Sequence, residues 1–385
     1  NIKLHQLQLE LIEHYLKISL VPLRSNFLDL WNYRLSCYVK PTNDKYMIRR
    51  GVEQLTGLVQ QLELFLEQLE DLEPPPFLLK AQELFERFNQ LVRKSKQKAI
   101  GKKLTHGDIN RFDNLFRRKK KELIRELLDL IYTLDCFISV AGTIDKFDFT
   151  IPEYDHSPTP QLSIYSLFHP FVDDCVKNDI QLGTASNLCF LTGPNMAGKS
   201  TFLKAIGLAV YLAHLGFPVP TSSMKTTVFN GLITTINLPD DINRGYSHYY
   251  SEVRRVKETV LKILEHKNVL VIFDELFRGT NVKDAYEASY KIIQKLVQIK
   301  DCLFFISTHI NEITAEFDHQ PISYHYFDSK LVADSPVYDY KLKSGISAER
   351  MGMQIIKNEK IIDLLDEVIG KQQQVSSRLH EDYSD

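Results

Sequence analysis

One short segment of the chain has the residue types and the spacing of a phosphate-binding loop. Residues 193–200 read G-P-N-M-A-G-K-S, which fits the pattern G-x-x-x-x-G-K-[ST], with an apolar run before it and a helix-forming run after it. Such a loop opens a helix, where backbone N–H groups and the helix dipole stabilise an anion. We predict a nucleoside-triphosphate site in which Lys199 bridges the β- and γ-phosphates and the Ser200 hydroxyl binds Mg²⁺. The residues predicted to contact the nucleotide here are Gly193, Pro194, Asn195, Met196, Ala197, Gly198, Lys199, Ser200 and Thr201.

Two adjacent carboxylates, Asp274 and Glu275, follow a second apolar run, residues 269–273. A buried strand tolerates paired acids only where it emerges at the carboxyl edge of a sheet, and ligands of α/β proteins bind at that edge. We therefore predict that Asp274 holds Mg²⁺ and that Glu275 polarises the attacking water; the alternative is a helix cap beside a surface acid. A third apolar run, residues 303–307, leads to His309, a candidate γ-phosphate sensor. The alternative for this lone histidine is a structural role.

The spacing of apolar residues divides the chain of 385 residues into two main parts. In residues 1–155 apolar residues recur every three or four positions, which predicts an all-α lever or core domain. In residues 162–344 short apolar runs alternate with helical stretches, which predicts an α/β P-loop domain with a mostly parallel sheet. Two short helices are predicted over 345–370, and the polar tail 371–385 is predicted to be disordered.

The same pattern places the individual elements. The helical part is expected to hold helices at about 3–20, 45–72, 77–99 and 108–141. The α/β part is expected to hold strands at 187–192, 228–236, 268–273 and 302–307, and helices at 199–214, 251–266 and 283–299. The phosphate loop then lies between the first of these strands and the first of these helices.

Charge is distributed unevenly along the chain. The formal net charge is −2, which does not suit a nucleic-acid binder that is basic throughout, but residues 93–121 carry twelve Lys or Arg against two acids. A stretch this basic attracts polyanions, because neutralising phosphates releases condensed counterions. The alternatives are a solvated helix face and an arm that pairs with the acidic segment 53–73. The residues predicted to contact DNA phosphates are Arg93, Lys94, Lys96, Lys98, Lys102, Lys103, Arg117, Arg118, Lys119, Lys120 and Lys121.

The composition argues against several classes of protein. Apolar residues make up 44% and charged residues 25%, as in ordinary soluble globular proteins. No uninterrupted apolar run reaches the roughly 18 residues that cross a bilayer, and no secretory signal is visible, so we expect a cytoplasmic protein without a membrane partner. The five cysteines are odd in number and form no C-x-x-C. Neither a disulfide framework nor a zinc knuckle is therefore expected.

Beyond the phosphate loop, further motifs stand in the order found in one known family. They are H-P at 169–170, N-D-x-x-L at 178–182, G-x-x-V-P at 216–220, D-D-I and then G-Y-S within 240–247, D-E-L-F-R-G-T at 274–280 and S-T-H at 307–309. Together with T-G-P-N-M-A-G-K-S-T at 192–201, they resemble the MutS family of DNA mismatch-repair ATPases. The resemblance extends over about residues 165–370, and the Asp-Glu pair resembles that of ATP-binding-cassette-type ATPases.

The resemblance implies an ATPase that uses ATP and Mg²⁺ and works as a head-to-tail homodimer on duplex DNA, with repair proteins as further partners. It implies that Ser247 acts in trans on the γ-phosphate bound by the other subunit, and that Tyr340 forms one wall of the adenine pocket. Residues 345–370 would be a helix-turn-helix dimer clasp. The implied function is DNA mismatch repair or a related DNA-maintenance task, with ATP hydrolysis coupled to lever movement.

Two residues depart from the family pattern. Cys175 stands where the family has a phenylalanine of the adenine pocket, and Phe277 replaces a glycine after the two acids. Because of these departures, a degenerate nucleotide-binding scaffold with little turnover remains an alternative function. A cassette-type or chromosome-maintenance ATPase is a further alternative, but the segment 240–252 lacks the L-S-G-G-Q-type signature expected of that class.

Overall fold

The computed structural model places the chain in two compact units, Asn1–Ser139 and Val140–Asp385, and each is described by itself. The described residues are 6–19, 43–67, 76–96, 104–236, 248–277, 280–308, 311–317, 320–332, 335–346, 356, 358 and 360–369. The boundary between the units falls inside a helix that runs to Phe147, whereas the sequence places the domain boundary at residue 155. The predicted domain limits therefore stay a prediction.

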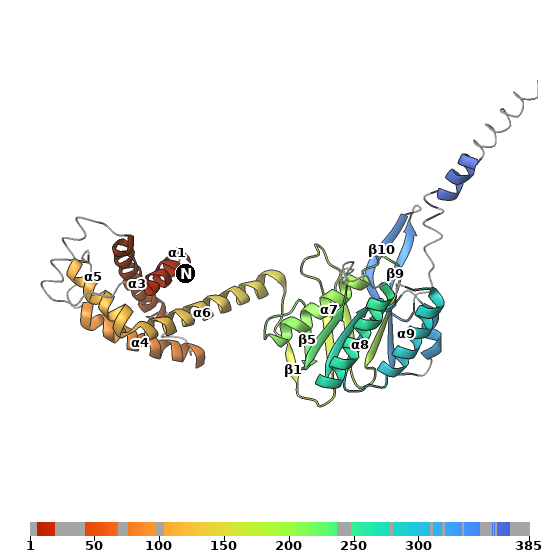
Figure 1. The fold of residues 1–385 in the computed structure, drawn as a ribbon, viewed down its shortest axis with the longest axis horizontal. Coiled ribbons are helices and arrows are strands. Elements are labelled where there is room, and N and C mark those ends of the chain that lie inside the picture. The colour runs from red at the N-terminus through yellow and green to blue at the C-terminus, as the bar shows by residue number, and fades with distance from the viewer. Residues whose placement is uncertain are drawn as a thin grey trace, which may run out of the picture. The chain divides into compact units, whose positions relative to one another are not determined.

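The regular elements described in the first unit are all helices (Figure 1). They are α1 (Gln6–Lys17), α3 (Asn43–Glu67), α4 (Pro76–Lys96), α5 (His106–Asp113), a π-helical turn (Asn114–Lys119) and α6 (Lys121–Phe147). Their apolar stripes meet in one core, in which Tyr15, Leu55, Phe88 and Phe116 are fully buried. The π-helical turn is a difference from the sequence expectation, because one continuous helix was predicted over 108–141.

A buried ion pair explains where that helix is interrupted. Arg117 lies in the π-helical turn, and its guanidinium donates to both carboxylate oxygens of Asp113, at 2.5 and 2.6 Å. Arg117 also donates to the Ile18 carbonyl oxygen (3.0 Å), and the Tyr15 hydroxyl donates to Asp113 (2.9 Å). Burial, and then the charge of Asp113, raise the pKa of Tyr15. The wider turn places the Arg117 side chain inside the core, where both charges are paired.

Arg117 corrects the predicted DNA-binding set. Its side chain is 4% exposed and is bound to Asp113, so it is not available to a phosphate. Arg118, Lys119 and Lys120 are exposed and Lys121 is half-buried, so the charge run does present a basic surface apart from Arg117. The remaining predicted residues, Arg93, Lys94, Lys96, Lys98, Lys102 and Lys103, have side chains outside the described part of the chain.

Removing Arg117 should destabilise the first unit strongly. In Arg117→Met the Asp113 carboxylate stays buried without its cation, which costs about 3–5 kcal/mol of unfolding free energy. Arg118→Met, at the exposed neighbouring position, is the matched control and should change stability by less than about 0.5 kcal/mol. Denaturant unfolding followed by circular dichroism measures both variants. Equal stability of the two would show that the pair does not support the fold.

Among the described residues, one helix, α6, is long and apolar enough to cross a membrane by length and composition. A single helix of this kind is weak evidence, because core helices of soluble proteins pass the same test. The N-terminal half of α6 does pack into the first unit through Ile124, Leu127 and Ile131. Asp129 and Asp135 interrupt its apolar run. The absence of a membrane partner stays an expectation.

The described strands of the second unit form two sheets. The larger has the order β10-β9-β4-β8-β7-β6, in which all neighbours from β9 to β6 run parallel and β10 is antiparallel at the edge. Its strands are β4 (Leu188–Thr192), β6 (Gly231–Thr235), β7 (Val269–Asp274), β8 (Leu303–Ser307), β9 (Ile322–Val332) and β10 (Ser335–Ser344). The smaller has the order β1-β5-β2-β3, with β1 (Glu153–Asp155), β2 (Leu162–Leu167), β3 (Asn178–Leu182) and β5 (Ser223–Thr227).

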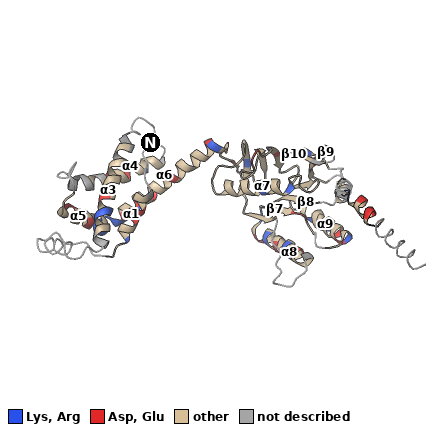
Figure 2. Cartoon of the chain, turned by 90° about the horizontal axis from the view of Figure 1, so that it is seen from above, with Lys and Arg blue, Asp and Glu red and all other residues tan. Residues whose placement is uncertain are grey.

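Helices cover both faces of the larger sheet (Figure 1). Its central strands are apolar on both sides: Cys189 and Leu191 of β4 face one core, and Leu188 and Phe190 face the other. The first core also contains α7 (Lys199–His214) and the smaller sheet. The second contains α8 (His248–His266) and α9 (Val282–Leu296). In Figure 2, α8 and α9 carry interspersed basic and acidic residues, whereas α7 carries no acidic residue.

The strand register brings three segments to one edge of the larger sheet. Leu191 of β4 and Asp274 of β7 both pair with Ser307 of β8. Because these strands are parallel, the segments that follow them leave the sheet at its carboxyl edge. This is the edge at which α/β sheets bind ligands.

Candidate functional site

The phosphate loop leaves β4 at residue 193 and enters α7 at Lys199. Gly193 and Gly198 have φ angles of 132° and 104°, which side chains rarely adopt. A Cβ atom at Gly193 would lie 2.5 Å from the Phe327 carbonyl oxygen, so only glycine fits against β9. Gly198 caps the N-terminus of α7, and the helix N–H groups of that terminus open toward the loop. The local geometry is that of an anion site at a helix end.

Lys199 is buried, and its ammonium group lies inside the loop. Nζ donates to the carbonyl oxygens of Gly193 (2.8 Å) and Pro194 (2.9 Å). Burial lowers the pKa of Lys199, and the negative charges of Glu275 and Asp274 oppose this shift. The loop carbonyls thus hold the Lys199 ammonium group at the helix N-terminus. There the ammonium group can exchange its contacts with the carbonyl oxygens for contacts with phosphate oxygens.

The two predicted carboxylates come at the end of β7, and Ser307 holds them. The Ser307 hydroxyl donates to Asp274 Oδ1 (2.7 Å) and accepts from the Glu275 backbone N–H (3.0 Å). Glu275 has a φ of 59°, a conformation that is strained for a residue with a side chain. Sequence reasoning missed Ser307, although its position before Thr308 and His309 was part of the motif. One hydroxyl therefore holds the Asp274 carboxylate and the backbone of Glu275.

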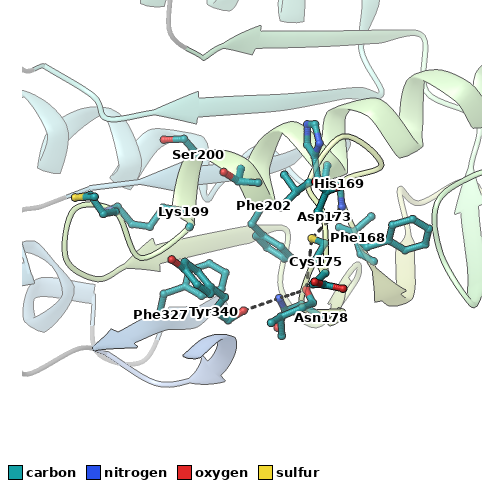
Figure 3. A pocket seen from close by; sticks show the side chains of 18 of the residues that line it. Phe168, His169, Asp173, Cys175, Asn178, Lys199, Ser200, Phe202, Phe327 and Tyr340 are labelled. Carbon is teal, nitrogen blue, oxygen red and sulfur yellow. Dashed lines mark hydrogen bonds between the residues drawn. The ribbon is translucent and has the colours of Figure 1, made fainter. Parts of the chain in front are cut away.

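A cavity of about 550 Å³ adjoins the loop (Figure 3). Of the predicted nucleotide contacts, Asn195, Met196, Gly198, Lys199, Ser200, Thr201 and Tyr340 line it, together with Glu275. Gly193 and Pro194 do not line it but hold the Lys199 ammonium, and Ala197 is fully buried. The structure thus gathers residues from the loop, from the end of β7 and from β10 around one space.

Opposite the loop, residues 167–178 form the other side of the cavity. Cys175 lines it and is half-buried; its sulfur accepts from the His169 backbone N–H (3.3 Å). Burial, and then the charge of Lys204, hold the pKa of His169 below its usual value. Tyr340 is 45% exposed and borders the same space. Of the two residues at the predicted adenine walls, Tyr340 alone offers an aromatic face.

The donor set at the loop suits Mg²⁺. Ser200 and Asp274 offer a hydroxyl and a carboxylate, which are hard oxygen ligands, and Mg²⁺ commonly takes few protein ligands besides substrate phosphates and water. Among the described residues there is no cluster of three or more His, Cys, Asp or Glu that could hold a metal ion by itself. A bound ion would therefore depend on the phosphates for part of its coordination.

Two predicted site residues, Ser247 and His309, lie outside the described part of the chain. The same holds for part of the segment 345–370 predicted as the dimer clasp, of which residues 345–346, 356, 358 and 360–369 are described. Their roles stay predictions.

Phe277, which departs from the family glycine, has a defined place. It is 4% exposed, with a φ of 59°, and packs edge-to-face on Tyr249 at a ring distance of 5.7 Å. Tyr249 lies in the first turn of α8, two residues after Ser247. The ring therefore connects the segment after the carboxylates with the start of α8.

Comparison with known proteins adds the family context. Residues 189–380 match the family profile described as MutS domain V. A protein named DNA mismatch repair protein MutS from Petrotoga mobilis is 30% identical over 239 residues, which is 61% of this chain and 29% of that protein. Proteins of the same name from Staphylococcus haemolyticus and Staphylococcus aureus are 28% and 26% identical, over 66% and 68% of this chain. The chain spans 28–30% of the length of these three relatives.

Proposed function

Because the chain belongs to the MutS family, we propose that it is an ATPase that couples ATP hydrolysis to DNA binding, in mismatch repair or a related DNA-maintenance task. The observation that carries the proposal is the cavity beside α7, which is lined by a buried cation, a helix N-terminus, a carboxylate and an aromatic ring. A nucleoside triphosphate combines an anionic chain with an aromatic base and matches this lining.

In the proposed reaction, Lys199 exchanges the carbonyl oxygens of the loop for the β- and γ-phosphates. Ser200 and Asp274 would hold Mg²⁺, which would neutralise phosphate charge. Glu275, which lines the cavity, accepts a proton from the attacking water, and Ser307 holds the backbone N–H of this residue. His309 senses the γ-phosphate.

We further propose a head-to-tail homodimer in the cytoplasm. Ser247 completes the γ-phosphate site of the other subunit, and residues 345–370 clasp that subunit. The free energy for movement of the helical lever comes from the different affinities of open and closed dimers for ATP and ADP. Duplex DNA and repair proteins are the proposed partners.

Turnover at increasing dilution tests the proposed ATPase. We expect Mg²⁺-dependent ATP hydrolysis whose rate per chain falls as the dimer dissociates, because each site needs Ser247 from the other subunit. Sedimentation at the same concentrations measures the dimer fraction, and Ser223→Ala, at an exposed serine of β5, is the control for Ser247→Ala. Nucleotide binding without turnover would favour the scaffold alternative. Full turnover by a strictly monomeric chain would contradict the role in trans.

The salt dependence of DNA binding tests the basic surface. Reversing the charges of Arg118 and Lys119, which are exposed, should lower the slope of log affinity against log salt by about 0.9 for each phosphate that the surface no longer neutralises. Reversing Lys257 and Lys262, two exposed lysines of α8, changes net charge equally and should leave the slope within error. Fluorescence anisotropy with a labelled duplex measures both. The same slope in both variants would argue against a role of this surface in DNA binding.

A further inference from the structure

The aromatic ring that borders the cavity is carried by a strained piece of backbone. Tyr340 has a φ of 52°, in the left-handed region that favours glycine. It lies in β10 where the pairing with β9 shifts register between Tyr338 and Leu342. A bulge of this kind re-aims a side chain but interrupts the ladder hydrogen bonds that would otherwise hold the strand. Some other group must therefore keep Tyr340 in place.

That group is the side-chain amide of Asn178, at the first residue of β3. Its Nδ2 donates to the Tyr340 carbonyl oxygen (3.0 Å), and its Oδ1 accepts from the Leu342 backbone N–H (2.7 Å). Nδ2 also donates to the Val176 carbonyl oxygen (3.2 Å). The amide thus holds the backbone on both sides of Lys341, across 162 residues of sequence (Figure 3). A side-chain amide offers both the donor and the acceptor that these backbone groups need.

This clamp sets the position of the ring relative to the phosphate loop. A Cβ atom built at Gly198, the residue before α7, would lie 3.3 Å from Tyr340 Cδ1, so the ring passes close to the loop. Tyr340, Gly198 and Asn178 all line the same cavity. Cys175, at the other predicted wall, has no aromatic face, so stacking of a base between these two walls depends on the Tyr340 ring.

We propose that Asn178 is a positioning residue for the nucleobase: it pins the β10 bulge and so presents the Tyr340 ring to the base. The inference rests on the proposed function, since it assumes that a nucleoside triphosphate occupies the cavity. Asn178 touches neither the phosphates nor the attacking water in this account. Its removal acts on binding of the base and leaves the phosphate loop as it is.

The test compares ATP with inorganic tripolyphosphate, which has the phosphates without the base. In Asn178→Leu we expect the Kd and the KM for ATP to rise about tenfold, in the range expected when one base–aromatic stack is removed, with kcat changed less than about twofold. Competition by tripolyphosphate should keep its wild-type strength. Tyr340→Ala should have the same effect, and the double variant should be no weaker than either single variant, because both remove the same stack. Asn178→Asp, which keeps the acceptor for the Leu342 N–H, should fall in between.

Asp179→Ala is the matched control. Asp179 is the next residue of β3 and also holds a backbone across the smaller sheet, through the Ser166 N–H (2.7 Å), but it does not contact Tyr340. The Asp179→Ala variant should bind ATP and tripolyphosphate with wild-type affinity.

Three outcomes would overturn the inference. They are equal weakening of ATP and tripolyphosphate binding by Asn178→Leu, no weakening of either, and an effect of Asp179→Ala on ATP binding. If Asn178→Leu does not fold, the same comparison of ATP and tripolyphosphate binding in Tyr340→Ala and Asn178→Asp tests the inference. A wild-type protein that binds tripolyphosphate as tightly as ATP overturns this inference alone, whereas one that binds neither overturns the proposed function as well.

Discussion

Replacing Lys199 with alanine should abolish detectable nucleotide binding. Among the described residues that line the cavity, Lys199 is the only lysine or arginine, and its ammonium is already held at the N-terminus of α7. Two charge-assisted hydrogen bonds to phosphate, at about 1.5–3 kcal/mol each, correspond to an affinity loss of at least about 100-fold. Isothermal titration with ATP and Mg²⁺ measures this loss directly.

Two further variants separate the missing charge from a disturbed loop. Lys199 also donates to the Gly193 and Pro194 carbonyl oxygens, so its removal leaves these acceptors without that donor. Lys199→Met keeps the length of the side chain and should bind ATP as poorly as the alanine variant. Lys204→Ala removes an exposed charge from the same helix and should bind ATP within about threefold of wild type. Unchanged affinity in both Lys199 variants would remove the phosphate loop from the proposed site.

Replacing Glu275 with alanine should separate binding from hydrolysis. The proposed general base contributes about 10²–10⁴-fold to the rate, so single-turnover hydrolysis should slow by that factor while ATP still binds. Because ATP is then not consumed, we expect the closed dimer to accumulate. Rapid quench measures the chemical step, and sedimentation in the presence of ATP measures the dimer.

The controls for this variant depend on the position of Glu275. Glu275→Gln keeps the shape and the hydrogen-bonding capacity but cannot accept a proton, so it should be as slow as the alanine variant. Glu287→Ala removes an exposed acid from α9 and should hydrolyse ATP at the wild-type rate. Robust turnover by both Glu275 variants would assign the base to another group and leave Asp274 and Ser307 to be tested.

The regular elements around the site could be predicted from local patterns. The helix expected at 199–214 is α7, Lys199–His214, and the strand expected at 302–307 is β8, Leu303–Ser307. Such elements bury continuous or periodic apolar stretches, so nearby residues carry the signal. The strands of the smaller sheet were not predicted, because they are short and mix polar with apolar residues, as in β5, Ser223–Thr227. The strands of the smaller sheet form because they pair with strands that are distant in sequence.

Departures from prediction arise where a residue's partner is far away in sequence. Arg117 belongs to a dense basic run, and Asp113, four residues before it, is its local partner. Its contacts with the Tyr15 ring and the Ile18 carbonyl oxygen, which lie far away in sequence, place it in the core. Ser307 is a small polar residue at the end of an apolar strand. Its pairing with Asp274, 33 residues away, brings its hydroxyl to the Asp274 carboxylate and to the Glu275 backbone N–H.

The order and spacing of residues were enough to predict the phosphate loop and the carboxylates after β7 and to identify the family, because these signals lie within short stretches of chain. The position of Tyr340 and the clamp by Asn178 depend on hydrogen bonds across 162 residues. A hydrogen bond has a direction and a reach of about 3 Å, so it exists only once packing has brought its two groups together. The local sequence around Asn178 or around Tyr340 therefore cannot predict that these two segments come within hydrogen-bonding distance.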